Sequence, residues 1–215
     1  AITGSITQQS NVVSAPLVLG YTFNYSMRSS ALNGGISLDV NLDTGGDNSD
    51  ETYAAARTGA DNAWSALKYH LSYDLVVGSN WLIHGRFSGQ STSDLLISGE
   101  QFGVGGSSTL RGFEERSITG DTGQQLSLEL WTPAYFGVKY LVFADQASVE
   151  FNAGTGANDG NSFDVSSYGL GARWSWKQQL SVSLDVGVIN KGGGLDTTLN
   201  QDGDSKAHFN LIYRF

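Results

Sequence analysis

An alternation of apolar and polar residues runs through most of this chain and limits the structures that it can form. The clearest case is the segment 168–176, in which every second residue is apolar: Tyr168, Leu170, Ala172, Trp174 and Trp176. Successive side chains of a β-strand point to opposite faces, so a period of two predicts strands with one apolar and one polar face. The sequence therefore predicts an all-β fold.

About nine segments follow this pattern and are predicted to be strands. They cover residues 16–26, 31–42, 63–75, 81–91, 124–132, 137–151, 165–176, 180–190 and 206–215. Residues 1–15 lack the pattern and are expected to be an irregular lead-in, and the polar residues 43–62 are expected to form a solvated loop. Short turns at one rim and long loops at the other are typical of an up-and-down barrel in an outer membrane.

The composition is compatible with such a barrel. The 215 residues include 28 Gly, 9 Tyr and 10 Phe but only 2 Pro, which favours strands and turns. The mean hydropathy is only −0.18, and no apolar run is long enough for a spanning helix. Barrel strands expose only every second residue to lipid, so a low hydropathy does not argue against them.

Several other classes are excluded or disfavoured. The net charge of −9 argues against a nucleic-acid partner, and the absence of Cys excludes disulfides and thiolate metal sites. Gly103-Val-Gly-Gly lacks the Lys-Ser/Thr of a phosphate-binding loop, and we expect no cofactor and no metal. An enzyme is not expected, because His70, His84 and His208 lie on separate strands and no Gly-x-Ser-x-Gly motif is present.

A soluble β-sandwich remains an alternative, because it also buries apolar faces, against a second sheet. However, nearly every strand here carries an apolar face, and the opposite face is polar enough to line water. We therefore predict a transmembrane antiparallel up-and-down β-barrel and keep a soluble sandwich binding domain as the less favoured interpretation.

The last segment, 206–215, places apolar residues at every second position up to the terminal aromatic residue. These residues are Phe209, Leu211, Tyr213 and Phe215. The pattern resembles the terminal signal of outer-membrane barrels, which implies that the barrel assembly machinery reads it.

The segment 95–123 is too long for a hairpin and is the strongest candidate for a functional element. Gly105 and Gly106 permit tight backbone turns and are predicted to be a hinge. The run Leu110-Arg111-Gly112-Phe113 then places a cation beside an aromatic ring in the middle of the loop. Loops of this length in a compact domain are usually functional or disordered, and the aromatic and glycine content favours function.

This loop carries a resemblance to a known family. Glu100-Gln-Phe, Gly105-Gly106, Arg111-Gly112-Phe113 and Gly120-Asp121 resemble the signature loop of two-partner secretion transporters. These TpsB-type proteins, which include FhaC-like and haemolysin-secretion proteins, belong to the BamA-like superfamily. Phe143-Ala144-Asp145-Gln146-Ala147 resembles the family's Phe-x-Asp-x-Gly motif, with Ala147 in place of the usual Gly.

The resemblance implies a specific contact. In the family the loop folds back into the lumen, and its Arg-Gly-Phe/Tyr tip contacts the motif on the barrel wall. Here the tip is Arg111-Gly112-Phe113 and the wall residues are Phe143 and Asp145. The alternation agrees, because Asp145 lies on the face opposite Tyr140 and Val142. We therefore expect an ion pair between Arg111 and Asp145 inside the barrel.

The resemblance also implies a location and a function. We expect a bacterial outer-membrane pore that exports an unfolded exoprotein, embedded in outer-membrane lipid. A BamA-like insertase of outer-membrane proteins, or a barrel fused to a patatin domain, is the alternative. The family's barrel has about sixteen strands and follows periplasmic POTRA domains. Residues 16–215 are therefore expected to be its C-terminal half, completed by the N-terminal part of the transporter or by another chain.

Overall fold

The computed structural model describes residues 11–214, except 157–158, 178 and 194–199. Within these residues, nine long strands form one antiparallel sheet. The strands are β1 (Pro16–Ser26), β2 (Ser30–Asn41), β3 (Ser65–Val77), β4 (Trp81–Ser91), β7 (Thr122–Trp131), β8 (Val138–Glu150), β9 (Ser162–Trp176), β10 (Leu180–Lys191) and β11 (Ser205–Tyr213). Each long strand pairs with the next long strand along the chain, which is an up-and-down arrangement. The predicted all-β, up-and-down fold is therefore confirmed.

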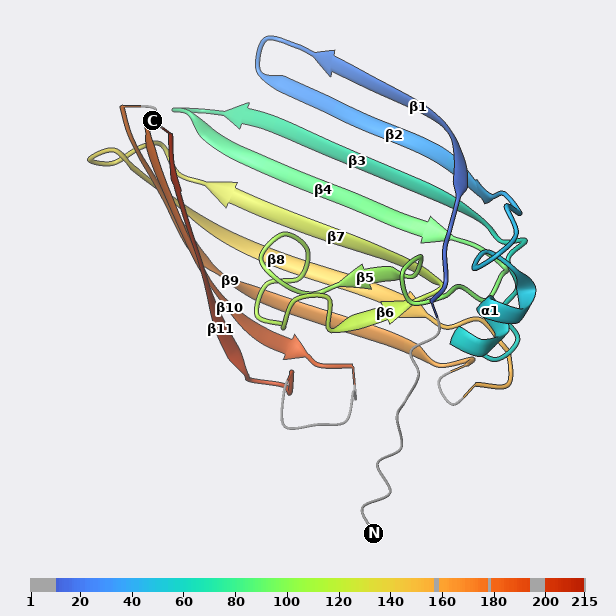
Figure 1. Cartoon of the computed structure of the whole chain (residues 1–215). Helices are drawn as coiled ribbons and strands as arrows, with labels where there is room; N and C mark the ends of the chain where they lie inside the picture. The colour runs from blue at the N-terminus through green and yellow to red at the C-terminus, as the bar shows by residue number, and fades with distance from the viewer. Residues whose placement is uncertain (1–10, 157–158, 178, 194–199, 215) are drawn as a thin grey trace.

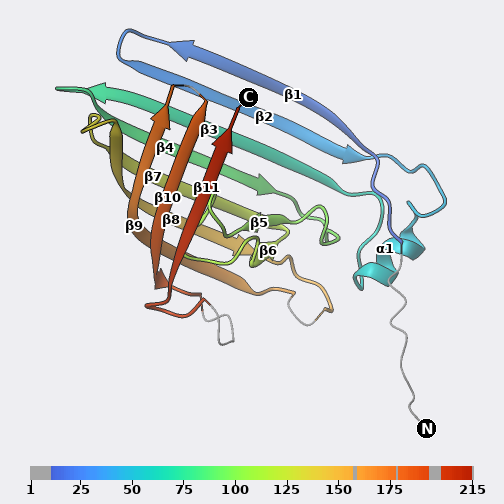
Figure 2. The same ribbon diagram turned by 60° about the vertical axis from the view of Figure 1, so that its left-hand side comes forward.

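The sheet is strongly curved but not closed. Figures 1 and 2 show it as a trough in which β9, β10 and β11 curl around to face the remaining strands. Strands β1 and β11 lie at the two edges of the sheet order, and no pairing joins them among the described residues. The molecule is thus an open part of a barrel.

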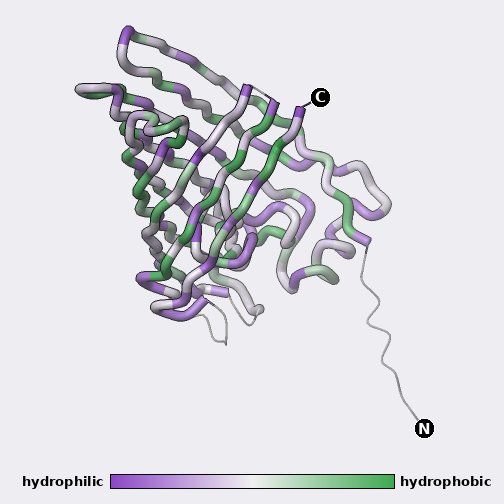
Figure 3. Tube along the Cα trace, turned by 90° about the vertical axis from the view of Figure 1, so that its left-hand side faces the viewer, coloured by the Kyte–Doolittle hydropathy of each residue, from purple (hydrophilic) through white to green (hydrophobic). Residues whose placement is uncertain are grey.

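Hydrophobic and hydrophilic residues alternate along the strands (Figure 3), and the exposures of the side chains assign them to the two faces of the sheet. On the convex face Leu170 and Tyr140 are 64% and 50% exposed, as lipid contact requires. On the concave face Phe143 and Asp145 are only 4% and 2% exposed. Within the described residues, no helix combines the length and the apolarity needed to cross a membrane.

The connections differ strongly between the two ends of the sheet. Short turns around 27–29, 78–80 and 132–137 join strands at one end, and the long connections 42–64, 92–121 and 151–161 all lie at the other. We call the second end the loop rim. In outer-membrane barrels the long loops are extracellular and the short turns periplasmic.

The prediction of a solvated loop at 43–62 is right for most of its residues, which are exposed, but wrong for the part that folds into a helix. The segment contains helix α1 (Asp50–Ala56), whose first turn is closed by a reciprocal capping box between Ser49 and Thr52. Tyr53 and Trp64 are 0% and 1% exposed, in an apolar cluster with Leu96 and Ile97 of the following long connection. Aromatic residues scattered through a polar segment thus fold it onto a neighbouring loop, a contact that strand periodicity does not reveal.

The long connection between β4 and β7 enters the trough. It contains a small hairpin of β5 (Phe102–Val104) and β6 (Ile118–Gly120), which lies in the concave side of the sheet in Figures 1 and 2. We call residues 92–121 the inner loop.

Candidate functional site

The inner loop is held in the trough by apolar packing. Leu110 and Phe113 of its tip are both fully buried. They belong to a cluster with Val149 of β8, Val165 of β9 and Ile189 of β10, all on the concave face. This cluster gives the loop an apolar seat on three neighbouring strands, and its burial is one source of the loop's stability.

Glycines shape the loop where it turns. Gly105 and Gly106 have φ angles of +119° and +92°, and Gly112 at the tip has a φ angle of +97°. These angles belong to a region that residues with a Cβ rarely adopt. The Gly112 amide donates to Nε2 of His208 on β11 at 3.3 Å, so the tip also reaches the last strand of the sheet.

Arg111 and Asp145 meet on the concave face. Nε of Arg111 donates to Oδ2 of Asp145 at 2.8 Å and Nη2 donates to Oδ1 at 2.7 Å, a bidentate pair. The backbone amide of Arg111 donates to Oδ2 as well, at 3.1 Å. Both residues are almost fully buried. Charge-assisted bidentate pairs are among the strongest hydrogen bonds in proteins and fix geometry in addition to adding energy.

A second carboxylate completes the environment of Arg111. Nη1 donates to Oε1 of Glu129 on β7 at 2.7 Å, and Nη2 donates to Ser127 at 3.1 Å. The guanidinium carbon lies 3.6 Å from the centre of the Phe143 ring, a cation–π contact. The tip arginine is therefore held from β7 and β8 together.

Sequence reasoning did not include Glu129 in the site. A signal was present, because Ser127 and Glu129 alternate with Leu126, Leu128 and Leu130 and so share the face opposite to lipid. An acidic residue on the inward face of a barrel strand needs a partner, and Glu129 is only 7% exposed.

The predicted assembly residues lie apart from this site. Phe209, Leu211 and Tyr213 are 67%, 55% and 57% exposed on β11, as the alternation predicts for outward-facing positions. Phe215 lies outside the described residues.

A polar cavity of about 360 Å³ lies beside the loop tip, toward the short turns. It is lined by Asp74, His84, Arg86, Trp131 and Arg173 together with Ser107 and Arg111. The charged groups are largely paired across neighbouring strands, as Arg173 is with Asp185 at 2.8 Å. Among the described residues, no group of three or more His, Asp or Glu side chains could hold a metal ion.

An open barrel wall with an apolar outer face and an arginine loop seated on its inner face defines a protein of the outer-membrane β-barrel class. Residues 5–174 match the family described as haemolysin secretion/activation protein ShlB/FhaC/HecB. The chain belongs to this family of bacterial outer-membrane β-barrel proteins. The family and the outer-membrane location predicted from the sequence are thereby confirmed.

Solved structures share the fold. CdiB from Acinetobacter baumannii is 16% identical, with a TM-score of 0.65 over 93% of this chain and 33% of that chain. BamA from Haemophilus ducreyi, solved without POTRA domains 1–3, is 18% identical, with a TM-score of 0.61 over 93% of this chain and 43% of that chain. The chain thus spans less than half of either structure. No curated protein sequence gives a significant match.

Proposed function

We propose that this chain forms part of the wall and the inner loop of a pore that exports an unfolded exoprotein by two-partner secretion. Docking of Arg111-Gly112-Phe113 on Asp145 would set the position of the loop in that pore. The observation that carries the proposal is the buried bidentate pair between Arg111 and Asp145, in a chain of a secretion family. A loop tied into the lumen in this way lies where an exported polypeptide has to pass.

The concave face suits an extended polypeptide. Its charged groups are paired between neighbouring strands, for example Lys68 with Asp39 at 2.8 Å, so the wall offers polar surface without a strong field of one sign. Passage of the exoprotein through such a pore would involve no chemical step and no cofactor. The energy for export would come from folding of the exoprotein outside the cell.

The remaining wall of the pore has to come from outside this sheet. Two open edges in lipid would leave rows of unpaired backbone groups, each costing several kcal/mol. We propose that the N-terminal part of the same transporter, or another chain, supplies the missing strands. Outer-membrane lipid surrounds the wall, and the barrel assembly machinery reads Phe209, Leu211, Tyr213 and Phe215. No nucleic-acid partner is proposed.

An insertase of outer-membrane proteins is the second candidate. The similarity of the fold to BamA supports it about as strongly as the similarity to CdiB supports a transporter. A barrel fused to a patatin domain is a further variant of this alternative. The domains that precede the barrel in the full-length protein would separate these possibilities.

The test is a secretion assay with the full-length transporter and its exoprotein. Arg111→Ala should leave the exoprotein in the periplasm while the barrel still assembles in the outer membrane. Arg28→Ala, at an exposed position in the turn between β1 and β2, is the control and should secrete normally. Unchanged secretion by Arg111→Ala would contradict the proposal. A general loss of other outer-membrane proteins would favour the insertase.

A further inference from the structure

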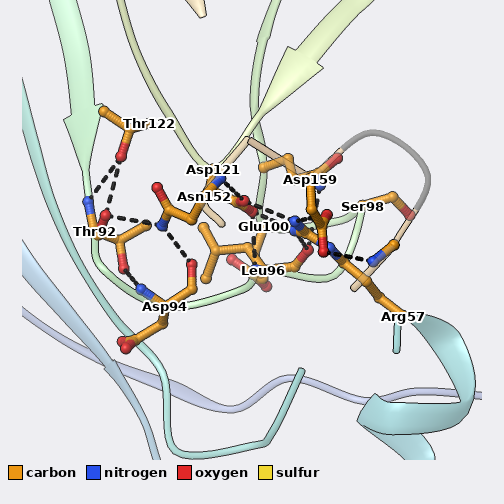
Figure 4. A network of polar contacts seen from close by, with 12 residues as sticks. Arg57, Thr92, Asp94, Leu96, Ser98, Glu100, Asp121, Thr122, Asn152 and Asp159 are labelled. Atoms are coloured by element: carbon orange, nitrogen blue, oxygen red, sulfur yellow. Dashed lines mark hydrogen bonds and ion pairs between the residues drawn. The ribbon is translucent and has the colours of Figure 1, made fainter. Parts of the chain in front are cut away.

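A second buried ion pair lies at the loop rim, where the inner loop returns to the sheet. Asp121 occupies the single position between β6 and β7 and is 0% exposed. Its Oδ1 accepts the backbone amide of Leu96 at 2.9 Å, and its Oδ2 accepts that of Asn152 at 2.8 Å. Asp121 therefore joins both ends of the inner loop to the connection after β8 (Figure 4).

Arg57 provides the cation for this carboxylate. It follows α1 directly, and both of its terminal nitrogens donate to Asp121, Nη2 to Oδ2 at 2.8 Å. Nη1 also donates to the carbonyl of Leu96 at 2.8 Å, and Nη2 to Oδ1 of Asp159 at 2.8 Å. One guanidinium thus connects three separate rim connections, as Figure 4 shows. We call Arg57, Asp121 and Asp159 the rim clamp.

Apolar packing supports the clamp from the side of α1. Tyr53 and Trp64 are buried against Leu96 and Ile97, so the segment that carries Arg57 is fixed on the inner loop. The side chain of Arg57 is 13% exposed, and its guanidinium lies 5.5 Å from the centre of the Phe151 ring. An ion pair in such an environment is little screened by solvent.

The inner loop is therefore attached at two points. The tip is held by the ion pair between Arg111 and Asp145. The neck of the loop, where Leu96 and Asp121 meet at the loop rim, is held by the ion pair between Arg57 and Asp121. Arg57 lies outside the long strands and outside the tip. Its hydrogen bonds go to the inner loop and to Asp159 in the connection after β8. A group that fixes the neck also limits how far the tip can move.

We propose that Arg57 is a positioning residue of the transporter: through Asp121 it holds the neck of the inner loop at the loop rim and thereby keeps the tip seated on the wall. The inference rests on the proposed role of the inner loop in export. Displacement of the whole inner loop by an exported polypeptide then requires that the guanidinium leave Asp121. The rim clamp and the ion pair at the tip would both restrain the inner loop, so both would have to break before the whole loop can move.

The test measures access to the tip and does not need the exoprotein. A single Cys replaces Ala147, which is 2% exposed in the apolar cluster beneath the seated tip, in the full-length transporter with any Cys elsewhere changed to Ser. Intact cells are treated with a membrane-impermeant maleimide, and the labelling rate is measured. Arg57→Ala removes the four hydrogen bonds that the guanidinium donates. It should raise the labelling rate by at least about tenfold, because even one charge-assisted hydrogen bond changes a local opening equilibrium by that order.

Two further variants sharpen the result. Arg57→Lys should give an intermediate rate, because a single ammonium cannot reproduce the fork on Asp121. Arg28→Ala removes an exposed arginine at the other rim and should label at the unchanged rate. Heat-modifiability in gels shows that each barrel is folded.

The proposal is wrong if the folded Arg57→Ala barrel labels at the original rate. If Arg57→Ala does not assemble, Arg57→Gln replaces it, with the same two outcomes. If Arg57→Ala labels faster and Arg111→Ala secretes normally, the proposed function of the tip is overturned and the rim clamp is supported. If Arg57→Ala labels at the original rate and Arg111→Ala fails to secrete, the rim clamp is overturned and the proposed function of the tip is supported.

Discussion

The backbone at Gly112 in the loop tip lies directly against Gly187 of β10. A Cβ on Gly187 would stand 2.6 Å from the Gly112 nitrogen and 2.7 Å from the Arg111 carbonyl carbon. Both are backbone atoms, which cannot move aside as a flexible side chain can. The tip therefore seats in the wall because two residues without side chains meet there.

Gly187→Ala should unseat the tip. The added methyl forces a backbone shift that costs about 1–3 kcal/mol, the usual range for overpacking. Arg111, now buried, would become available to trypsin, and mass spectrometry of the digest would locate the cut. Gly85→Ala is the matched control, because its Cβ would lie 3.5 Å from the Leu128 side chain, an ordinary contact. Equal resistance of both variants would disprove the close-approach argument.

Loss of Arg111 should destabilise the barrel through the acids that it leaves behind. Arg111→Ala strands Asp145 and Glu129 on the concave face, and removing one partner of a buried pair costs about 3 kcal/mol. Arg111→Lys should recover little of this, since one ammonium cannot replace the guanidinium fork. Glu129→Gln in the Arg111→Ala background should recover part of it by removing one charge. Thermal unfolding of the purified barrel measures each step, and no recovery in the double variant would exclude a contribution from Glu129.

A charge on the convex face should impair membrane insertion. Leu170→Arg places a cation in the middle of β9 on the lipid side, at a cost of about 2–4 kcal/mol near the bilayer midplane. Ser72→Arg, on the concave face of β3, carries the same new side chain into the lumen and should assemble normally. The amount of heat-modifiable protein in outer membranes compares the two. Equal assembly would contradict the assignment of the faces.

Acid should loosen the loop rim only at low pH. The hydrogen bond from Arg57, the amide of Gly156 and the charge of Arg57 hold the pKa of Asp159 below its ordinary value of 3.8. A lowered carboxyl pKa adds stability that is complete above the unfolded pKa and is lost as the pH falls through the folded one. Asp121 accepts hydrogen bonds from the same guanidinium.

Hydrogen exchange of residues 151–161, corrected for the intrinsic rate at each pH, would measure this loosening. We expect protection to persist at pH values above 3.8 and to fall below it. Asp159→Asn should lack the step, because the amide does not titrate. A loss of protection already at mildly acidic pH would show that another group controls the rim.

The sequence by itself determined the strands and their faces. The alternation places all nine strands, and it puts Asp145 on the face opposite to Tyr140 and Val142. It could do so because strand periodicity is local: every second side chain faces lipid, and the sequence records this directly. The match of the Arg111 loop to a family motif added the expected partner of Arg111.

The tertiary structure alone decided which groups meet once the sheet curves. Glu129 joins Arg111 from β7, Gly187 meets Gly112, and Arg57 reaches Asp121 across 64 positions of the chain. Helix α1 was missed because its stability comes from Tyr53 and Trp64 packing on the inner loop, whereas seven residues of its own sequence would form only a marginal helix. Such contacts depend on the curvature of the sheet and on the path of a long loop, and neither is encoded in a local pattern.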